Sequence, residues 1–270
     1  LYITCSIYAL PPLRTDDFAL RTCNPLRTCY GLRTDDFGLR TMKRHSFISV
    51  IAVLQSHSHI RTLQAWLNGL YGELSEQFSD FEFIIVNNHC SIADIDEVIR
   101  PLPEDLRKNI FMLNLSTPVS RDNALLAGLD RANGDYTVIF DFDFAGQPQV
   151  LTQLWERSQQ GFDIVYLRAR ERLLPLPQRL LYRIFYFILK RYSQLRIDPW
   201  AHHTRLISRR ALNSLLRLRE NSRYLKANYA LVGYQTAFLP TEVPLHAEPE
   251  TTFGEQFRTA LVAVTSFTTF

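Results

Sequence analysis

The stretch SRDNALLAGLDRANGDYTVIFDFDF, residues 120–144, decides the fold. Residues 120–132 place apolar side chains at helical spacing, Gly134 and Asp135 form a turn, and 136–144 is an apolar run rich in aromatic residues. We expect a helix followed by a buried strand that carries Asp141 and Asp143 at its end. Buried carboxylates are costly unless they are paired or bind a metal, so these two residues are candidates for function.

The same alternation extends over most of the chain. Strands are predicted at 47–55, 81–88, 110–115, 136–144 and 162–170. Helices are predicted at 59–77, 93–101, 120–132 and 148–160. Continuous apolar strands separated by amphipathic helices indicate an α/β fold with a mostly parallel sheet flanked by helices. Ligands bind beyond the carboxyl ends of the strands in such sheets, and Asp141 and Asp143 fall at such an end.

Composition narrows the class of protein. The 270 residues are 46% hydrophobic and carry a net charge of +3, which is too small to indicate a nucleic-acid partner. Of the four cysteines, three lie at positions 5, 23 and 29, which does not suggest a disulfide framework and favours a reducing compartment. No apolar run reaches the roughly 18 residues that a spanning helix needs.

Three segments are expected along the chain. Residues 1–41 repeat the tripeptide LRT and lack the apolar content of a solenoid, so we predict a disordered extension; an interaction tail is the alternative. MKRHSFISVIAVL, from Met42, reads like a natural start, and the single folded domain is predicted at 46–250. Residues 251–270 are predicted as an apolar, amphipathic end segment.

The D-x-D pattern suits a hard divalent cation. Carboxylate oxygens are the ligands that such ions prefer, and a cation held there has room for phosphate oxygens. We therefore predict Mg²⁺ or Mn²⁺ at Asp141 and Asp143, bridging the diphosphate of a nucleotide and stabilising the charge of the departing group. The alternative is a solvated turn with two unrelated acidic residues.

In order and spacing these motifs resemble the inverting family 2 glycosyltransferases with the GT-A (Rossmann-like) fold, particularly the branch of dolichol-phosphate mannose synthase and bacterial polyprenyl-phosphate glycosyltransferases. The resemblance runs from about Phe47 to the C-terminus. It is carried by ISVIAVLQSHSHIRTLQAWLNGL, FEFIIVNNHCS, the stretch 120–144, GFDIVYLRARER and TRLISRRALNSL. Asn87 stands where the family has an aspartate, Ala145 where it usually has a glutamine, and His203 aligns with another family aspartate.

The resemblance implies a reaction and its residues. It implies sugar transfer from a UDP- or GDP-sugar to an acceptor, with a polyprenyl phosphate expected. The donor-binding residues it implies, together with their neighbours at the strand ends, are Val53, Asn87, Asn88, Asp135, Asp141, Arg170 and Arg205. His203 and Asp198 are the candidate catalytic bases, although an acceptor that is already a phosphate anion needs none. An exposed loop pair is the alternative for His202 and His203.

The stretch QRLLYRIFYFILKRYSQLR, residues 178–196, predicts a basic, aromatic-rich amphipathic helix at a membrane surface. A core-packing helix is the alternative. We expect a cytoplasmic protein bound peripherally at the inner face of the membrane.

Rival functions stay open at this point. A catalytically degenerate relative that only binds is favoured by Asn87, Ala145 and His203. A D-x-D phosphatase normally has its motif on the first strand, whereas three predicted strands precede it here. A nucleotidyltransferase would want a glycine-rich loop after the first strand, and LQSHSHIRT has no glycine.

Overall fold

The computed structural model describes residues 43–173, 197–218 and 225–246, together with 179–180, 183–184 and 186–187. The predicted extension at 1–41 and end segment at 251–270 lie outside the described residues, as does most of the predicted helix at 178–196.

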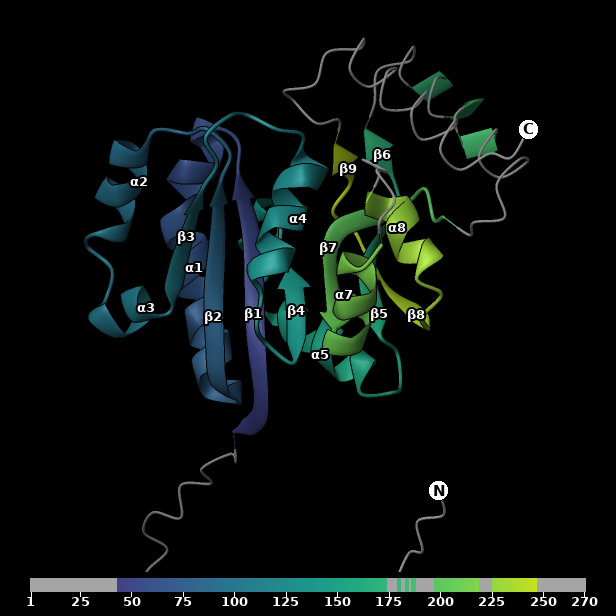
Figure 1. The fold of residues 1–270 in the computed structure, drawn as a ribbon, viewed down its shortest axis with the longest axis horizontal. Coiled ribbons are helices and arrows are strands. Elements are labelled where there is room, and N and C mark those ends of the chain that lie inside the picture. The colour runs from purple at the N-terminus through teal and green to yellow at the C-terminus, as the bar shows by residue number, and fades with distance from the viewer. Residues whose placement is uncertain are drawn as a thin grey trace, which may run out of the picture. The chain divides into compact units, whose positions relative to one another are not determined.

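A seven-stranded sheet in the order β3-β2-β1-β4-β7-β5-β8 forms the centre of the fold (Figure 1). Its strands are β1 (Arg44–Leu54), β2 (Phe78–Asn87), β3 (Ile110–Asn114), β4 (Tyr136–Ile139), β5 (Ile164–Ala169), β7 (Ala201–Ser208) and β8 (Thr236–Thr241). Only β7 runs against its neighbours, β4 and β5. Two short strands, β6 (Arg172–Leu173) and β9 (Leu245–His246), pair separately. The predicted mostly parallel α/β fold is confirmed.

Helices cover both faces of the sheet. The described helices are α1 (His57–Gln77), α2 (Ile92–Ile99), α3 (Glu104–Lys108), α4 (Arg121–Arg131), α5 (Gln149–Ser158), α7 (Arg209–Leu216) and α8 (Leu225–Leu231). The core on one face is built from α1, α2, α3 and α5, around Trp66 and Phe140. The other core is built from α4, α7 and α8, around Ile51 and Leu129. Figure 1 shows α4 and α7 over the same face.

Local sequence explains where helix α4 begins and how closely it packs. The Ser120 side chain caps its first turn by accepting a hydrogen bond from the Asn123 backbone N–H at 3.4 Å. Gly128 lies against the sheet so closely that a Cβ there would be 2.7 Å from Ile51 Cγ2. The helix therefore holds its N-terminal residues at a fixed place beside the carboxyl ends of the strands.

Strand β4 is shorter than the sequence predicted. It ends at Ile139, and Phe142–Phe144 form a 3-10 turn, η1, instead of continuing the strand. The turn directs the rings of Phe142 and Phe144 into the same core, where Phe142 stacks on His59 with 4.9 Å between ring centroids. Burial of both rings in one core thus favours a turn over a longer strand.

Strand order places a topological switch point between β1 and β4. From β1 the chain moves outward to β2 and β3, and α4 then returns it to β4 on the other side of β1. The crevice at the carboxyl ends of two such strands is the usual ligand site of an open α/β sheet. Asp141 follows β4 at this point.

Candidate functional site

Asp141 is held from two sides at the switch point. The guanidinium of Arg121, the first residue of α4, forms an ion pair with its carboxylate through Nη2 and Oδ1. The Asp141 backbone N–H donates to Thr204 Oγ1 of β7 at 3.0 Å. Only 18% of the Arg121 side chain and 15% of the Asp141 side chain are exposed. The pair is therefore a shielded charge pair on a rigid backbone.

Asp143 lies on the η1 turn and is exposed. The flanking residues Phe142 and Phe144 are buried, and the Phe144 ring packs edge-on against His202 with 5.1 Å between centroids. Because these rings anchor the turn, Asp143 faces outward while Asp141 faces Arg121. The structure thus brings the two predicted metal ligands to one short segment but gives them different surroundings.

The first turn of α4 also contacts α8 and β7 through Asp122. One carboxylate oxygen of Asp122 accepts a hydrogen bond from the Leu225 backbone N–H at 2.9 Å, and the other lies 3.9 Å from His203 Nδ1. Sequence reasoning missed Arg121 and Asp122. The signal was available, because the helix after a parallel strand begins at the carboxyl edge of the sheet.

His202 and His203 lie on strand β7, so the alternative of an exposed loop pair is wrong. His202 Nε2 is 3.0 Å from the Val243 carbonyl oxygen, and burial lowers the pKa of His202 to about 4. His203 points to the opposite face, toward Asp122. Burial, followed by the charges of Arg121 and Lys226, lowers the pKa of His203 well below 6.5. Both imidazoles are neutral at pH 7, the form in which a histidine accepts a proton.

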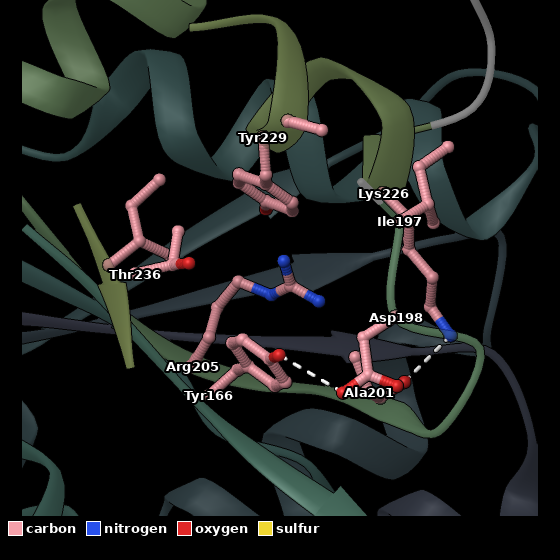
Figure 2. Close-up of a pocket in the computed structure, with 10 residues that line it drawn as sticks. Tyr166, Ile197, Asp198, Ala201, Arg205, Lys226, Tyr229 and Thr236 are labelled. Atoms are coloured by element: carbon pink, nitrogen blue, oxygen red, sulfur yellow. Dashed lines mark hydrogen bonds between the residues drawn. The ribbon is translucent and has the colours of Figure 1, made fainter. Parts of the chain in front are cut away.

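Arg205 and Asp198 border a small pocket beside this cluster (Figure 2). Arg205 is 3% exposed, its guanidinium carbon lies 3.9 Å from the centroid of the Tyr229 ring, and its Nη2 donates to the His202 carbonyl at 2.8 Å. These contacts fix the guanidinium inside the fold rather than at the surface.

Asp198 holds the turn before β7. Its Oδ1 accepts from the Trp200 backbone N–H at 2.9 Å, and its Oδ2 accepts from the Tyr166 hydroxyl at 3.0 Å, as Figure 2 shows for the second bond. Arg168 Nε lies 3.1 Å from the same Oδ2. Burial first, and the Asp198 carboxylate second, raise the pKa of Tyr166 to about 12, so the hydroxyl stays protonated and keeps donating.

The predicted donor residues of β1 and β2 lie at the same edge of the sheet. Val53 is 7% exposed, Asn87 3% and Asn88 8%. Asn88 clamps the segment before α4, because its side chain accepts from the Val119 backbone N–H at 2.9 Å and donates to the Val119 carbonyl at 2.8 Å. The Asn88 amide thus positions the chain that leads to Arg121.

Two predicted donor residues lie apart from this cluster. The structure corrects the placement of Asp135, which precedes β4 and accepts a hydrogen bond from the Phe47 backbone N–H at 2.9 Å, at the amino ends of the strands. A residue before a strand and one after it are at opposite edges of the sheet, so Asp135 does not meet Asp141. Arg170 follows β5 at the carboxyl edge, where it is exposed and pairs with Glu242 at 2.8 Å.

The acidic side chains at this edge of the sheet are too few to hold a divalent cation by themselves. No group of three His, Cys, Asp or Glu side chains that could hold a metal ion occurs among the described residues. Mg²⁺ is usually held by one or two carboxylates with substrate phosphates supplying further oxygens. Two carboxylates alone do not complete the coordination of such an ion, so an ion at Asp141 and Asp143 would need diphosphate oxygens as well.

The family model described as Glycosyl transferase family 2 matches residues 61–216, more than half of the chain. The chain belongs to this family, as its resemblance predicted. The match spans α1 to α7 and thus includes Arg121, Asp141, Asp143, His203 and Arg205.

Two of the proteins that are similar to this chain are named as glycosyltransferases. An uncharacterized glycosyltransferase of Synechocystis sp., sll0501, is 29% identical over 162 residues, covering 59% of this chain and 50% of the relative. The bactoprenol glucosyl transferase of Shigella phage SfV is 28% identical over 169 residues, covering 60% and 53%. The chain spans about half the length of the curated relatives it matches.

A solved structure supports the fold assignment. Glucosyl-3-phosphoglycerate synthase of Mycobacterium tuberculosis, in complex with Mn²⁺, UDP-glucose and phosphoglyceric acid, superposes with a TM-score of 0.50 at 14% identity, covering 82% of this chain and 78% of the synthase. At this identity the likeness concerns the fold alone. Within the described part of the chain, no helix is both long and apolar enough to cross a bilayer.

Proposed function

We propose that the protein is an inverting glycosyltransferase that moves a sugar from a nucleotide-sugar donor to a polyprenyl phosphate. The observation that carries the proposal is the position of Asp141 and Asp143 directly after β4, at the switch point beside β1. Family membership and relatives named as bactoprenol and undecaprenyl-phosphate transferases support this reaction class.

We further propose that Asp141 and Asp143 hold Mg²⁺ or Mn²⁺ together with the donor diphosphate. A bound cation of this kind neutralises charge on the leaving diphosphate. The position of the two acidic residues just after β4 at the switch point, where a diphosphate would supply further oxygens, supports the assignment. The synthase whose structure contains Mn²⁺ and UDP-glucose is a fold relative that combines such an ion with such a donor.

The donor is proposed to lie across the carboxyl ends of β1, β2 and β4. Val53, Asn87 and Asn88 border this crevice near the nucleoside. Because both asparagine side chains are already bonded within the protein, they shape the crevice and leave backbone groups to contact the base and ribose. Exposed Arg170 and buried Arg205 contribute positive charge on the side of β5 and β7.

The acceptor is proposed to attack the anomeric carbon opposite the departing diphosphate. A phosphate anion needs no base for this step, and a monoprotonated phosphate must lose one proton. His203 is the candidate acceptor of that proton, because it is neutral and lies 3.9 Å from Asp122, next to Arg121; its lowered pKa makes it a weak base. Asp198 is the weaker candidate, since both of its oxygens are engaged in the turn before β7.

The acceptor class calls for a membrane surface, and the six described residues of the 178–196 stretch agree with one. All six are helical, and Leu180, Ile184 and Phe187 are 61%, 48% and 68% exposed. Arg179 and Arg183 on the same stretch are exposed and suit anionic headgroups. We propose peripheral attachment at the cytoplasmic face of the membrane.

Calorimetric titration with UDP- and GDP-sugars in the presence of Mn²⁺ tests the proposal. One of these donors should bind, and Asp143→Asn should weaken its Mn²⁺-dependent affinity at least tenfold. Asp130→Asn is the matched control, because Asp130 is an exposed carboxylate on α4. An equal affinity in Asp143→Asn, or no binding of any donor, would overturn the proposal. Donor binding without transfer to undecaprenyl phosphate would overturn the proposed acceptor and would be the result that the degenerate, binding-only alternative predicts.

A further inference from the structure

We propose that Arg121 is an internal counter-ion that competes with a divalent cation for the carboxylate of Asp141, so that the cation enters only together with an anionic diphosphate. The competition between Arg121 and a cation depends on residues of the chain alone. The entry of the cation together with a diphosphate, which then binds Arg121 in place of Asp141, rests on the proposed function.

The geometry makes competition unavoidable. Arg121 Nη2 is bonded to Oδ1 of Asp141, the carboxylate that a cation would need. The Asp141 backbone is fixed, because its N–H is bonded to Thr204 and its carbonyl accepts the Phe144 N–H at 3.1 Å, so only side chains can rearrange at this site. Arg121 has more rotatable side-chain bonds than Asp141, so it is the partner that a cation or an anionic ligand can displace. A cation on Asp141 therefore either displaces the guanidinium or binds beside a positive charge.

The surroundings oppose a cation that arrives alone. Arg121 pairs with Asp141, Lys226 donates to the Ala201 carbonyl at 2.7 Å and Arg205 donates to the His202 carbonyl at 2.8 Å, so three positive charges lie around the start of β7 on this side of the crevice. Among the described residues, the acidic groups near them include Asp122, Asp141 and Asp198; Asp122 is engaged with the Leu225 backbone and His203, and Asp198 with Tyr166 and the Trp200 backbone. A diphosphate adds negative charge and offers Arg121 oxygens to bind in place of Asp141. The cation and the diphosphate should thus enter as a unit.

Mn²⁺ binding without nucleotide, followed by electron paramagnetic resonance, tests the competition directly. Arg121→Gln should bind Mn²⁺ at least tenfold more tightly than the parent protein. Arg131→Gln is the matched control, because Arg131 ends the same helix and lies over the Phe111 ring, 4.2 Å from its centroid. The control should leave Mn²⁺ affinity unchanged. Equal Mn²⁺ affinity in Arg121→Gln and the parent would overturn the proposal.

A measurement on the unaltered side chain covers the case in which Arg121→Gln does not fold, since the substitution leaves a shielded carboxylate without its partner. The nitrogen-15 signal of Arg121 Nε, assigned by its absence in Arg121→Lys, should stay in place with Mg²⁺ alone at millimolar concentration and move with Mg²⁺ and UDP together. A shift caused by Mg²⁺ alone would overturn the proposal. If neither UDP nor GDP binds, the proposed function fails, while the nucleotide-free Mn²⁺ comparison still decides the competition.

Discussion

Asn87 and Asn114 join the carboxyl ends of β2 and β3, where Asn87 Nδ2 donates to Asn114 Oδ1 at 3.0 Å. The same Nδ2 donates to the Cys90 carbonyl at 3.1 Å, and Asn87 Oδ1 accepts from the Cys90 N–H at 2.7 Å. This closed turn holds His89 in the left-handed region at a φ of 68°. The Asn87 amide therefore uses both its donors and its acceptor within the fold.

Asn87→Asp should destabilise the protein, although it introduces the residue that related sequences are expected to have. The carboxylate keeps the acceptor for Cys90 but loses the donor and faces two oxygens at a site that is 3% exposed. We expect a loss of about 2 kcal/mol in the free energy of unfolding, measured in urea. The exposed Asn133 provides the control substitution, Asn133→Asp. Equal stability of the two variants would show that the amide donor is dispensable.

The sequence predicted the part of the fold that rests on local pattern. The helix at 120–132 and the strands at 47–55 and 81–88 agree with α4, β1 and β2 to within three residues at each end. Continuous apolar runs and helical spacing depend on neighbouring residues alone, so they can be recognised without knowledge of the tertiary structure. The position of Asp141 at a strand end followed directly from them.

What the sequence did not predict depends on partners far along the chain. Strand β7 lies between β4 and β5 and runs antiparallel, which brings His203 to Asp122, 81 positions earlier. The pairing of Arg121 with Asp141 likewise requires knowing that α4 begins at the carboxyl edge. The prediction for Asp135 rested on the family motif alone. It did not consider that a residue before a strand lies at the amino edge of the sheet. The order of the strands in the sheet decides the first two, whereas the edge occupied by Asp135 follows from its place before a strand.

Gly128→Ala should loosen the packing of α4 on the sheet. The added Cβ would lie 2.7 Å from Ile51 Cγ2 and 2.9 Å from Val86 Cγ2, and both belong to β-branched residues on rigid strands. We expect a net loss of about 1–2 kcal/mol, because the strain exceeds the gain in helix propensity. Gly72→Ala in α1 meets nothing within 4 Å and should be neutral or up to about 1 kcal/mol more stable. Thermal unfolding of both variants measures the difference, and equal stabilisation by both would contradict the packing argument.

Phe187→Glu should weaken binding to anionic membranes. Phe187 is 68% exposed on the helical residues near 179–187, beside Arg183, and a carboxylate there opposes both insertion and headgroup attraction. Co-sedimentation with phosphatidylglycerol vesicles should show at least a fivefold loss of bound protein. Phe238→Glu, on the edge strand β8 with 44% exposure, is the control for a general charge effect. An equal loss in both variants would mean that the added negative charge weakens vesicle binding wherever it is placed, and that Phe187 has no special role.

His202 should make the protein less stable in mild acid. Burial lowers its pKa to about 4 in the folded state, against 6.5 for an ordinary histidine, so the unfolded chain binds a proton that the folded protein refuses. The neutral, buried ring contributes its full stability above pH 6.5. That contribution falls as the pH drops from 6.5 toward 4, by about 2 kcal/mol at pH 5.

The variant His202→Gln isolates this contribution, because the glutamine amide retains a donor for the Val243 carbonyl but does not titrate. Urea unfolding at pH 8 and at pH 5 should give the parent protein a decrease in unfolding free energy about 2 kcal/mol larger than that of the variant. His203, whose pKa is also lowered, contributes to both proteins; His202 is only the last of the causes of that shift, so most of the His203 contribution cancels in the comparison. The same decrease in the two proteins would mean that the His202 ring takes up its proton without unfolding, and that the contact between Phe144 and this ring does not keep it neutral.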